Sequence, residues 1–249
     1  MTKILTIDSS TEACSVALDL DGIHRSLFEL APRRHAELLL PMVHQLLSES
    51  KIELKELDAI ACCVGPGAFT GLRIAISVAQ GLAYASNLPC IAISSLDTMA
   101  QQAFASSNAE YCLASIDARM KEVYFSILQR EVAGIGERDS HIGFHKTFMQ
   151  EQVIAPKLID LKGSITAEDK IIKVGTGWSE YQYNDEIEVL TAENTQTDSP
   201  EQGIILYPDA KWMLRIANKK YEAGELLEPA QLQPVYLRNN VALKKSERK

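Results

Sequence analysis

The sequence contains an internal repeat with a spacing of about 110 residues. Ile7-Asp8 opens a strand-turn-strand pattern, and Ile116-Asp117 opens a similar one 109 positions later. Gly65 and Gly175 each follow an apolar run, and they lie 110 positions apart. Two independent similarities at nearly the same spacing indicate a duplicated unit. An Asp-bearing hairpin and a glycine turn in each half are typical of α/β proteins that bind a nucleotide between two lobes.

The length of 249 residues allows two compact lobes of roughly 100 residues each. With 46% hydrophobic residues, the chain can bury a full core. We predict an N-terminal lobe over residues 1–105 and a C-terminal lobe over residues 106–249, the latter with a C-terminal helix and a basic tail. The fold class expected from this pattern is α/β, with a mixed sheet and helices in each lobe.

The opening ten residues enter a β-like alternation without a long apolar segment. We therefore expect no secretory signal and no membrane span, and a cytoplasmic protein. The five cysteines lie inside apolar runs and lack CxxC spacing. This pattern favours buried structural thiols over a metal site. The cysteines are Cys14, Cys62, Cys63, Cys90 and Cys112.

A net charge of −8 argues against a chain that binds nucleic acid alone, because Lys and Arg supply most non-specific affinity for phosphates. Any RNA role would need a basic partner. The exception is the C-terminal end, where four basic residues surround Glu247. This end is either a solvated tail or a tail that touches phosphates. The four residues are Lys244, Lys245, Arg248 and Lys249.

Hydrophobic periodicity predicts strands and helices in both halves. In the first half, the predicted strands are 3–8, 14–20, 57–64 and 91–93, and the predicted helices are 33–49, 70–85 and 96–104. In the second half, the predicted strands are 111–118, 122–130 and 171–174, with an irregular stretch before the last, a loop over 191–203 and a helix over 208–223.

The two long helices of the first half carry candidate partner-binding residues. On the first helix, the predicted core stripe is Ala36, Leu39, Leu40, Val43, Leu46 and Leu47. Leu38 and Met42, beside His35, lie away from that stripe and indicate a second apolar surface. On the second helix, Arg73, Ser77, Gln80 and Tyr84 form a narrow polar line between small residues. The predicted partner interface consists of Arg33, His35, Leu38, Leu39, Met42, Arg73, Ser77, Gln80 and Tyr84. Burial of both helices inside their own lobe is the alternative.

The hairpin turns carry candidate nucleotide-binding residues. A turn rich in Ser and Thr after an Asp can offer amides and hydroxyls to a phosphate, while the carboxylate holds a hydrated Mg²⁺. An Asp before Ser is also very often only a turn or a cap. The candidate residues for a vestigial nucleotide site are Asp8, Ser9, Ser10, Thr11, Asp117, Arg119 and Gly175.

Histidines give no clear metal site. His141 and His145 have the spacing of a helical metal pair, but Gly136 and Gly143 argue against a helix there. We expect a solvent-exposed loop pair. No arrangement of Ser, His and Asp suggests a hydrolase.

Several long motifs resemble the TsaB family, also called YeaZ, of threonylcarbamoyladenosine biosynthesis proteins. They are GPGAFTGLR within 64–100, the opening IDSSTEACSVAL, the helix RRHAELLLPMVHQLL, the segment DARMKEVY and the closing PVYLRNN. The resemblance covers essentially the whole chain. It implies the duplicated actin-like, Hsp70-like and sugar-kinase-like (ASKHA) fold. It also implies a role with TsaD, with TsaE and its ATP, and with TsaC, in forming threonylcarbamoyladenosine at position 37 of tRNAs.

One departure from the related transferase TsaD bears on mechanism. TsaD-like enzymes carry a His-x-x-x-His metal pair after the strand that matches 91–93, and the matching positions here are Ser95 and Met99. Neither side chain replaces an imidazole ligand. The resemblance therefore implies a chain with no catalytic residues and no metal of its own, which pairs with TsaD through the two long helices and reaches tRNA through the complex. It also implies a homodimer when TsaD is missing.

Nucleotide binding and two other functions stay open. We expect no tightly bound cofactor on the isolated chain, with ATP or ADP possible at the partner interface. The first alternative function is a nucleotide-dependent small-molecule kinase of the same fold, in which Asp8 and Asp117 hold Mg-ATP. The second is a metallopeptidase, which requires metal ligands.

Overall fold

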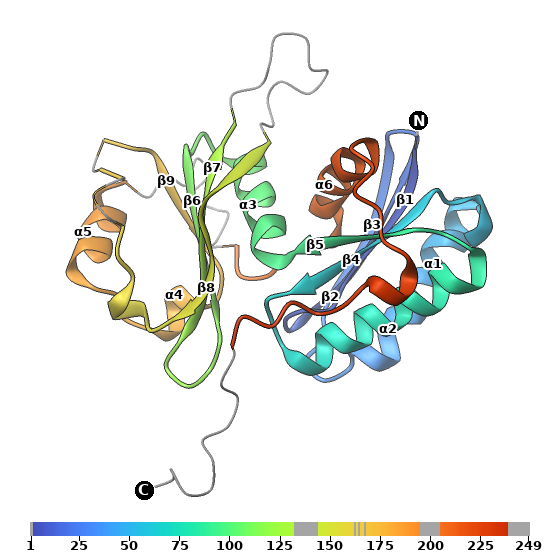
Figure 1. The fold of residues 1–249 in the computed structure, drawn as a ribbon, viewed down its shortest axis with the longest axis horizontal. Helices are drawn as coiled ribbons and strands as arrows, with labels where there is room; N and C mark the ends of the chain where they lie inside the picture. Colours follow the sequence, from blue (N-terminus) through green and yellow to red (C-terminus); the bar gives the residue numbers. More distant parts are fainter. Residues whose placement is uncertain are drawn as a thin grey trace, which may run out of the picture.

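Both lobes of the computed structural model are built on a mixed sheet whose first three strands form an antiparallel meander (Figure 1). The structure describes residues 2–131, 144–161, 163, 165–166, 168–194 and 205–238. Figure 1 shows the two sheets in separate lobes, with α3 and α6 between them. The basic tail, Gly136, His141 and Gly143 of the sequence predictions lie outside the described residues, as does most of the predicted loop over 191–203.

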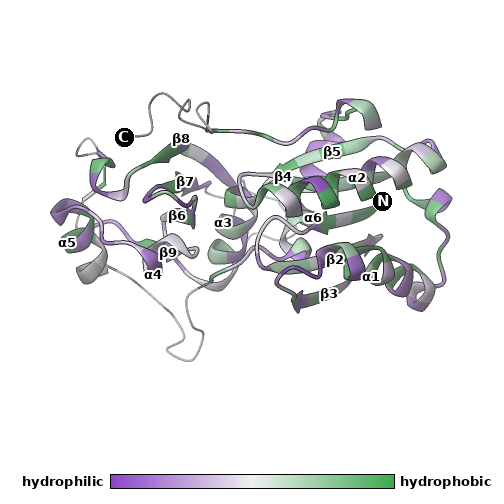
Figure 2. Cartoon of the chain, turned by 90° about the horizontal axis from the view of Figure 1, so that it is seen from below, coloured by the Kyte–Doolittle hydropathy of each residue, from purple (hydrophilic) through white to green (hydrophobic). Residues whose placement is uncertain are grey.

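The first sheet has the strand order β3-β2-β1-β4-β5, and β4 and β5 continue it in parallel with β1. Its strands are β1 Lys3–Asp8, β2 Ala13–Leu20, β3 Ile23–Leu30, β4 Ala59–Gly65 and β5 Cys90–Ser94. The helices of this half are α1 His35–Ser50, α2 Phe69–Ser86 and α3 Ser95–Ser106, with the short 3-10 helix η1 Leu54–Glu56. Figure 2 shows β3 at the border of this lobe, beside α1.

The second sheet repeats the first without its fifth strand. Its order is β8-β7-β6-β9, with β9 parallel to β6. The strands are β6 Tyr111–Asp117, β7 Val123–Arg130, β8 His145–Ile154 and β9 Ile171–Val174. The helices of this half are α4 Gly177–Glu180, α5 Asp185–Asn194 and α6 Ala210–Glu222, with the short 3-10 helices η2 Pro156–Leu158 and η3 Pro229–Gln231. The predicted duplication is therefore confirmed strand by strand.

Strands β3 and β8 and helix α5 are the longest elements that differ from the sequence prediction. Strand β3 was not predicted, and β8 replaces part of the stretch predicted as irregular. Both strands lie at sheet edges, where neither alternation nor a continuous apolar run is required, so periodicity gives no signal. Helix α5 covers residues 191–194 of the predicted loop. Its first turn is acidic, and its polar composition concealed the helix.

Two helices pack on the sheet formed by the other half of the chain. Helix α3 follows β5 but packs on β6, β7 and β9, whereas α6 comes from the second half and packs on β1, β2 and β5. The predicted division after residue 105 separates the two sheets, but these helices cross it. A hydrophobic cluster lies on each face of each sheet. All five cysteines are buried and free, as predicted from their apolar neighbours.

The β1–β2 turn is pressed against the first turn of α2. A Cβ at Gly71 would lie 2.0 Å from the carbonyl oxygen of Ser9, and a Cβ at Gly67 would lie 2.2 Å from that of Ser10. Only glycine fits at such distances from a backbone oxygen. The Ser9 hydroxyl donates to the Gly71 carbonyl at 2.9 Å, and the Ala68 N–H donates to the Ser10 carbonyl at 2.7 Å.

We expect Gly71→Ala to lower the free energy of unfolding by about 2 kcal/mol or more, because the contact of its Cβ with Ser9 forces the turn away from α2. Gly81→Ala is the matched control, since Gly81 lies in the same helix with no atom within 4 Å of its Cβ position. The control should gain about 0.5–1 kcal/mol from helix propensity. Urea denaturation of both variants tests the expectation, and equal effects would show that the close contact carries no constraint.

Candidate functional site

A cavity of about 680 Å³ lies between the two lobes, where the β1–β2 turn faces the β6–β7 turn. The first turn of α2 and the segment 235–238 complete its wall. The lining residues from the two turns are Ser10, Thr11, Glu12, Asp117, Ala118, Arg119 and Met120. The two Asp-bearing hairpins of the sequence repeat therefore meet at one site.

The β1–β2 turn places Asp8 behind the cavity wall. The Asp8 side chain is buried, with Oδ1 accepting from the Ser10 N–H at 2.6 Å. Within the described residues, Oδ2 has no hydrogen bond of normal geometry. Of the residues predicted for nucleotide binding, Ser10, Thr11, Asp117 and Arg119 line the cavity, whereas Asp8, Ser9 and Gly175 do not. The Asp8 carboxylate turns back to close its own loop, so its role at a nucleotide stays a prediction.

Burial raises the pKa of the Asp8 carboxyl to about 6, because the charged form loses its hydration. Hydrogen bonding from Ser10 and from the Cys63 thiol opposes this shift, and the charge of Asp209 adds to it. Burial, and then the charge of Asp8, raise the pKa of the Cys63 thiol well above its usual range. Ionisation of this carboxyl at the end of β1 therefore lowers the stability of the folded state.

The β6–β7 turn repeats this geometry in a more open setting. Asp117 Oδ1 accepts from the Arg119 N–H at 2.7 Å, just as Asp8 accepts from Ser10. Its carboxylate also accepts from the Tyr181 hydroxyl at 2.7 Å and pairs with the Arg119 guanidinium at 2.8 Å. In both turns, an amide that could bind a phosphate is bonded to its own Asp.

Gly175 is a structural turn residue. Its φ of +103° lies in the region that favours glycine, and a Cβ there would lie 2.0 Å from the carbonyl oxygen of Ser115. The close approach joins the end of β9 to β6. Its repeat partner Gly65 also has a positive φ, of +111°. The glycine repeat in the sequence therefore marks two equivalent strand ends, behind the cavity wall.

A C-terminal strap, defined as residues 232–238, closes one side of the cavity. The Val235 N–H donates to the Val64 carbonyl at 2.9 Å, and the Tyr236 ring stacks on Phe69 with 5.8 Å between centroids. At the other lobe, the Arg238 guanidinium pairs with the Glu122 carboxylate. The strap therefore connects both lobes. Sequence reasoning identified it only as a resemblance motif, because it has no periodicity.

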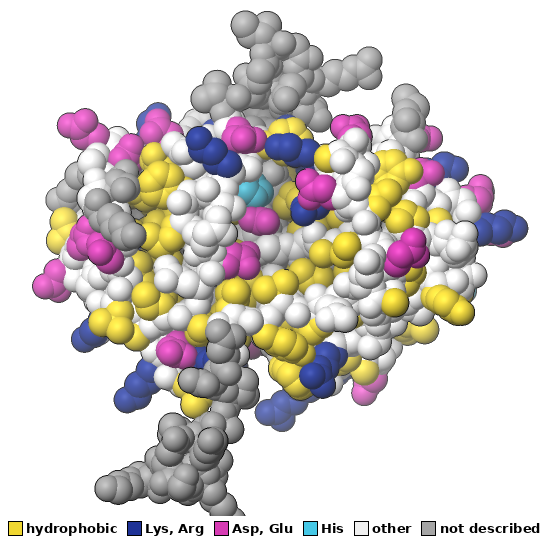
Figure 3. All heavy atoms as spheres, viewed as in Figure 1, with side chains coloured by type: hydrophobic (Ala, Val, Ile, Leu, Met, Phe, Trp, Pro, Cys, Tyr) yellow, Lys and Arg dark blue, Asp and Glu magenta, His cyan; other side chains and the backbone are white. Residues whose placement is uncertain are grey.

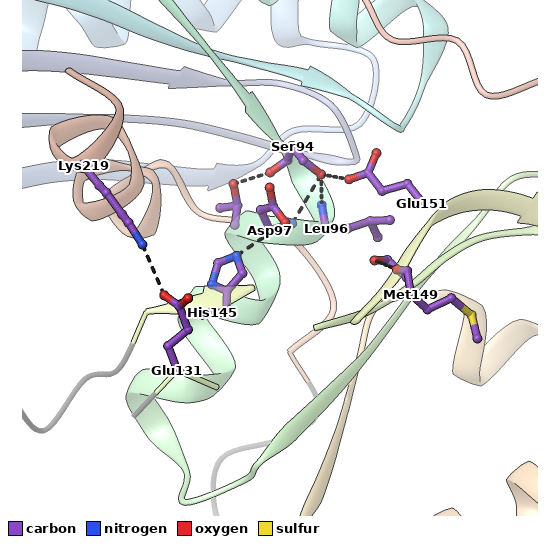
Figure 4. A network of polar contacts seen from close by, with 10 residues as sticks. Ser94, Leu96, Asp97, Glu131, His145, Met149, Glu151 and Lys219 are labelled. Atoms are coloured by element: carbon purple, nitrogen blue, oxygen red, sulfur yellow. Dashed lines mark hydrogen bonds and ion pairs between the residues drawn. The ribbon is translucent and has the colours of Figure 1, made fainter. Parts of the chain in front are cut away.

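A second set of contacts joins the lobes away from the strap (Figure 4). The Ser94 hydroxyl at the end of β5 donates to the Glu151 carboxylate on β8. Burial, and to a lesser degree Asp97, raise the pKa of Glu151 to about 7, against the effect of the Ser94 hydrogen bond. Lys219 on α6 pairs with Glu131 at 3.3 Å. These polar contacts and the strap hold the lobes on two sides.

The predicted exposed position of His145 is wrong. His145 begins β8, and its side chain is only 9% exposed. Its Nε2 lies 3.4 Å from Oδ1 of Asp97 on α3. Pairing of β8 with β7 brings the imidazole over α3, which the sequence did not show because β8 was not predicted.

The predicted interface residues divide into exposed and buried groups. On α1, Leu39 is fully buried, and Met42 and His35 are each 8% exposed, so these three belong to the core side. Leu40 and Ala36, which were predicted to be core, are exposed. The buried side of the helix is therefore shifted by about one residue from the predicted side, because His35 and not Ala36 faces the core. Leu38 is half-buried, and Arg33 lies exposed just before the helix.

On α2, most of the residues predicted to form a polar line lie at the surface of the protein. Arg73, Ser77 and Tyr84 are exposed, and Tyr84 is 83% exposed. Gln80 instead donates to the carbonyls of Pro229 and Leu232, at 3.0 and 2.9 Å, and so anchors the start of the strap. We call the exposed set Leu40, Arg73, Ser77 and Tyr84 the helical face. Figure 3 shows hydrophobic side chains beside basic ones along the lower side of the first lobe.

No helix within the described ranges is both long enough and apolar enough to cross a bilayer. Among the same residues, no cluster of three or more His, Cys, Asp or Glu side chains is arranged to hold a metal ion.

Comparison with known proteins gives a consistent result. A family model described as TsaD, tRNA N6-adenosine threonylcarbamoyltransferase, matches residues 27–245. The chain is 40% identical over 245 residues to the tRNA threonylcarbamoyladenosine biosynthesis protein TsaB of Escherichia coli, which covers 98% of this chain and 97% of that protein. It is 38% identical to the protein of the same name from Haemophilus influenzae, over 97% and 96% of the two chains.

Two solved structures from Pseudomonas aeruginosa share the fold. One is described as YeaZ and has a TM-score of 0.76 at 38% identity, covering 95% of this chain and 100% of that one. The other is described as an uncharacterized protein with similarity to peptidase YEAZ, with a TM-score of 0.78 at 39% identity over 96% and 100% of the chains. Together with the repeated strand order, these matches show a duplicated ASKHA-like fold.

The raised pKa of Asp8 predicts a pH-dependent loss of stability. The pKa is 3.8 in the unfolded chain and about 6 in the folded one, so the folded state binds the proton more tightly. The contribution of the protonated Asp8 carboxyl to the free energy of unfolding is complete below about pH 4. It is lost as the pH rises through about 6. Asp8→Asn avoids the ionisation, and we expect it to raise the free energy of unfolding at pH 8 by up to about 3 kcal/mol.

Thermal denaturation of Asp8→Asn and wild type from pH 4 to pH 8 measures this effect. The gain should shrink toward pH 4, where the native carboxyl is protonated. Asp21→Asn, the same change at an exposed turn, is the control and should give no such trend. A gain that is equal at all pH values would contradict the assignment of the cost to ionisation.

Proposed function

Because the chain belongs to the TsaB family of tRNA threonylcarbamoyladenosine biosynthesis proteins, we propose that it is a catalytically inactive partner of a TsaD-type threonylcarbamoyltransferase. In this proposal, TsaC makes threonylcarbamoyl-AMP, and the chain supports transfer of the threonylcarbamoyl group to tRNA by TsaD, together with TsaE and ATP. The chain contributes a binding surface and supplies none of the reacting groups.

The observation that carries this proposal is the environment of Ser95 and Met99. These positions match the metal-binding histidines that the family resemblance assigns to the transferase. Ser95 is fully buried, and its hydroxyl donates to the Pro66 carbonyl. Met99 is fully buried in the hydrophobic cluster between α3 and the second sheet. Both positions are therefore used for packing, and a thioether in such a cluster is a poor ligand for a hard catalytic metal.

The helical face supports the partner role. Leu40 is 50% exposed and Tyr84 is 83% exposed, on two helices that pack against each other. Exposed apolar and aromatic groups on the same pair of helices as an exposed arginine, Arg73, are typical of a protein interface. In the proposed contact, the exposed Leu40 replaces Leu39 and Met42, which are buried. Gln80 contributes indirectly, because its side chain holds the start of the strap. Pairing of two copies by this face remains a prediction.

The kinase alternative receives little support from the cavity. It requires Asp8 and Asp117 to hold Mg-ATP, but Asp8 does not line the cavity and Asp117 is bonded to Arg119 and Tyr181. The Ser10 and Arg119 amides are bonded within their own turns. No observation favours a metallopeptidase. An adenine nucleotide at the partner interface stays a prediction.

Threonylcarbamoylation of unmodified tRNA, with threonylcarbamoyl-AMP supplied, tests the proposal. The chain alone, the TsaD-type enzyme alone, the pair, and the pair with TsaE and ATP are compared. We expect no product from the chain alone, and more product from the full set than from the enzyme alone. Product from the chain alone would overturn the proposal, and so would an enzyme that the chain does not stimulate.

We expect Leu40→Glu to weaken binding to the TsaD-type enzyme by at least about tenfold, because it places an unpaired carboxylate in an apolar contact. Val189→Glu is the matched control, since Val189 is a 59% exposed aliphatic residue on α5 of the other lobe. Isothermal titration of both purified variants measures the difference. Equal affinities would remove Leu40 from the interface.

A further inference from the structure

Arg73 is the only charged residue of helix α2. The sequence of the helix from Phe69 to Ser86 contains no acid and no other base. The Arg73 side chain is exposed, and no carboxylate among the described residues forms an ion pair with it. A protein that covered the helical face would bury this guanidinium, and a buried charge without a partner is strongly destabilising. The helical face therefore requires a partner that supplies an acceptor at this one position.

Two contacts hold the Arg73 guanidinium in one orientation. Its Cζ atom lies 3.8 Å from the centroid of the Phe69 ring, and its Nε donates to the Tyr236 hydroxyl at 3.2 Å. The Phe69 and Tyr236 rings also stack on each other. A free surface arginine loses rotamer entropy when it binds a partner, and a side chain that is already held loses less. The strap therefore prepares Arg73 for binding.

These contacts leave the outer edge of the guanidinium available. A guanidinium carries five N–H donors in a fixed fork, and Nε–H is the one that has an acceptor within the described residues. The four N–H groups on Nη1 and Nη2 match the two oxygens of a carboxylate, which such a fork binds with two parallel hydrogen bonds. A lysine ammonium offers no such fork and no planar surface for stacking.

We propose that Arg73 binds a carboxylate of the TsaD-type partner, and that the strap sets the strength of this contact by orienting the guanidinium through Tyr236. The identity of the partner rests on the proposed function. Because the rest of α2 is uncharged, the complementary surface carries one Asp or Glu side chain among uncharged neighbours. Arg73 is the residue that contacts the partner, and Tyr236 is a positioning residue.

The same contact links the helical face to the cavity between the lobes. Phe69 and Tyr236 both line the cavity, and Val235 beside them donates its N–H to the Val64 carbonyl. A carboxylate that fixes Arg73 therefore also stabilises the strap in its closed position over the cavity. By linkage, the closed strap raises the affinity for the carboxylate by the same factor. Partner binding and access to the cavity are thus coupled through three side chains.

Hydrogen exchange of the isolated chain tests the hold of Arg73 on the strap. Arg73→Gln and Tyr236→Phe each remove the hydrogen bond between the two residues. Each should speed exchange in peptides covering residues 233–238 at least about threefold. The double variant should exchange no more than about twofold faster than the faster single variant, because both changes remove one contact. Tyr84→Phe is the matched control at an 83% exposed position of the same helix, and it should have no effect.

Isothermal titration with the TsaD-type enzyme tests the carboxylate. Arg73→Gln should raise the dissociation constant at least about tenfold and should reduce its dependence on salt between 50 and 300 mM, on the order of a threefold change for one exposed ion pair. Arg73→Lys keeps the charge and should still raise the constant about fivefold, because the fork is lost. Tyr236→Phe should raise it about threefold. Arg25→Lys, at an exposed position of β3, is the control and should change nothing.

Hydrogen exchange of the complex tests the coupling. The enzyme should slow exchange over residues 233–238 of the wild-type chain at least about threefold, and saturating enzyme should not slow it in Arg73→Gln. Equal slowing in both chains would contradict the inference, because the partner would then cover the strap directly.

The titrations separate this inference from the proposed function. An affinity that Arg73→Gln leaves unchanged would overturn the inference alone. A loss of affinity with an unchanged salt dependence would do the same, because the group that meets Arg73 would then be uncharged. If the enzyme failed to bind the wild-type chain, the proposed function would fall, and with it the partner named here.

Discussion

The contact between the β1–β2 turn and the first turn of α2 constrains the rest of the first lobe. Gly67 and Gly71 let the helix backbone reach the carbonyls of Ser9 and Ser10, where any Cβ would collide. This contact fixes the start of α2, and through it the position of Phe69, on which the strap packs. The same tight turn directs Asp8 inward, where it bonds the Ser10 amide. A phosphate would have to compete with that internal bond, so a turn closed in this way stabilises the fold at the expense of ligand binding.

The crossing of α3 and α6 between the lobes joins the two halves of the chain by apolar contacts. Each helix fills a face of the sheet that the other half of the chain provides. Separation of the lobes would expose both clusters to water, at about 25 cal/mol per Å² of apolar surface. The strap and the contacts around Ser94 and Glu151 add polar links at the rim. The contacts between the lobes are therefore apolar at the two helices and polar at the rim.

Much of the fold could be predicted from the sequence, because buried elements carry a strong periodic signal. The hairpin at Asp8, its repeat at Asp117 and the helices around Leu46 and Ala75 all show it. Edge strands β3 and β8 lack that signal, since packing does not dictate their residues. The buried side of α1 was misassigned by one residue because His35 occupies a core position that its polarity conceals. The cavity wall depends on the strap, whose contacts with Val64 and Glu122 are far apart in sequence and follow no local pattern.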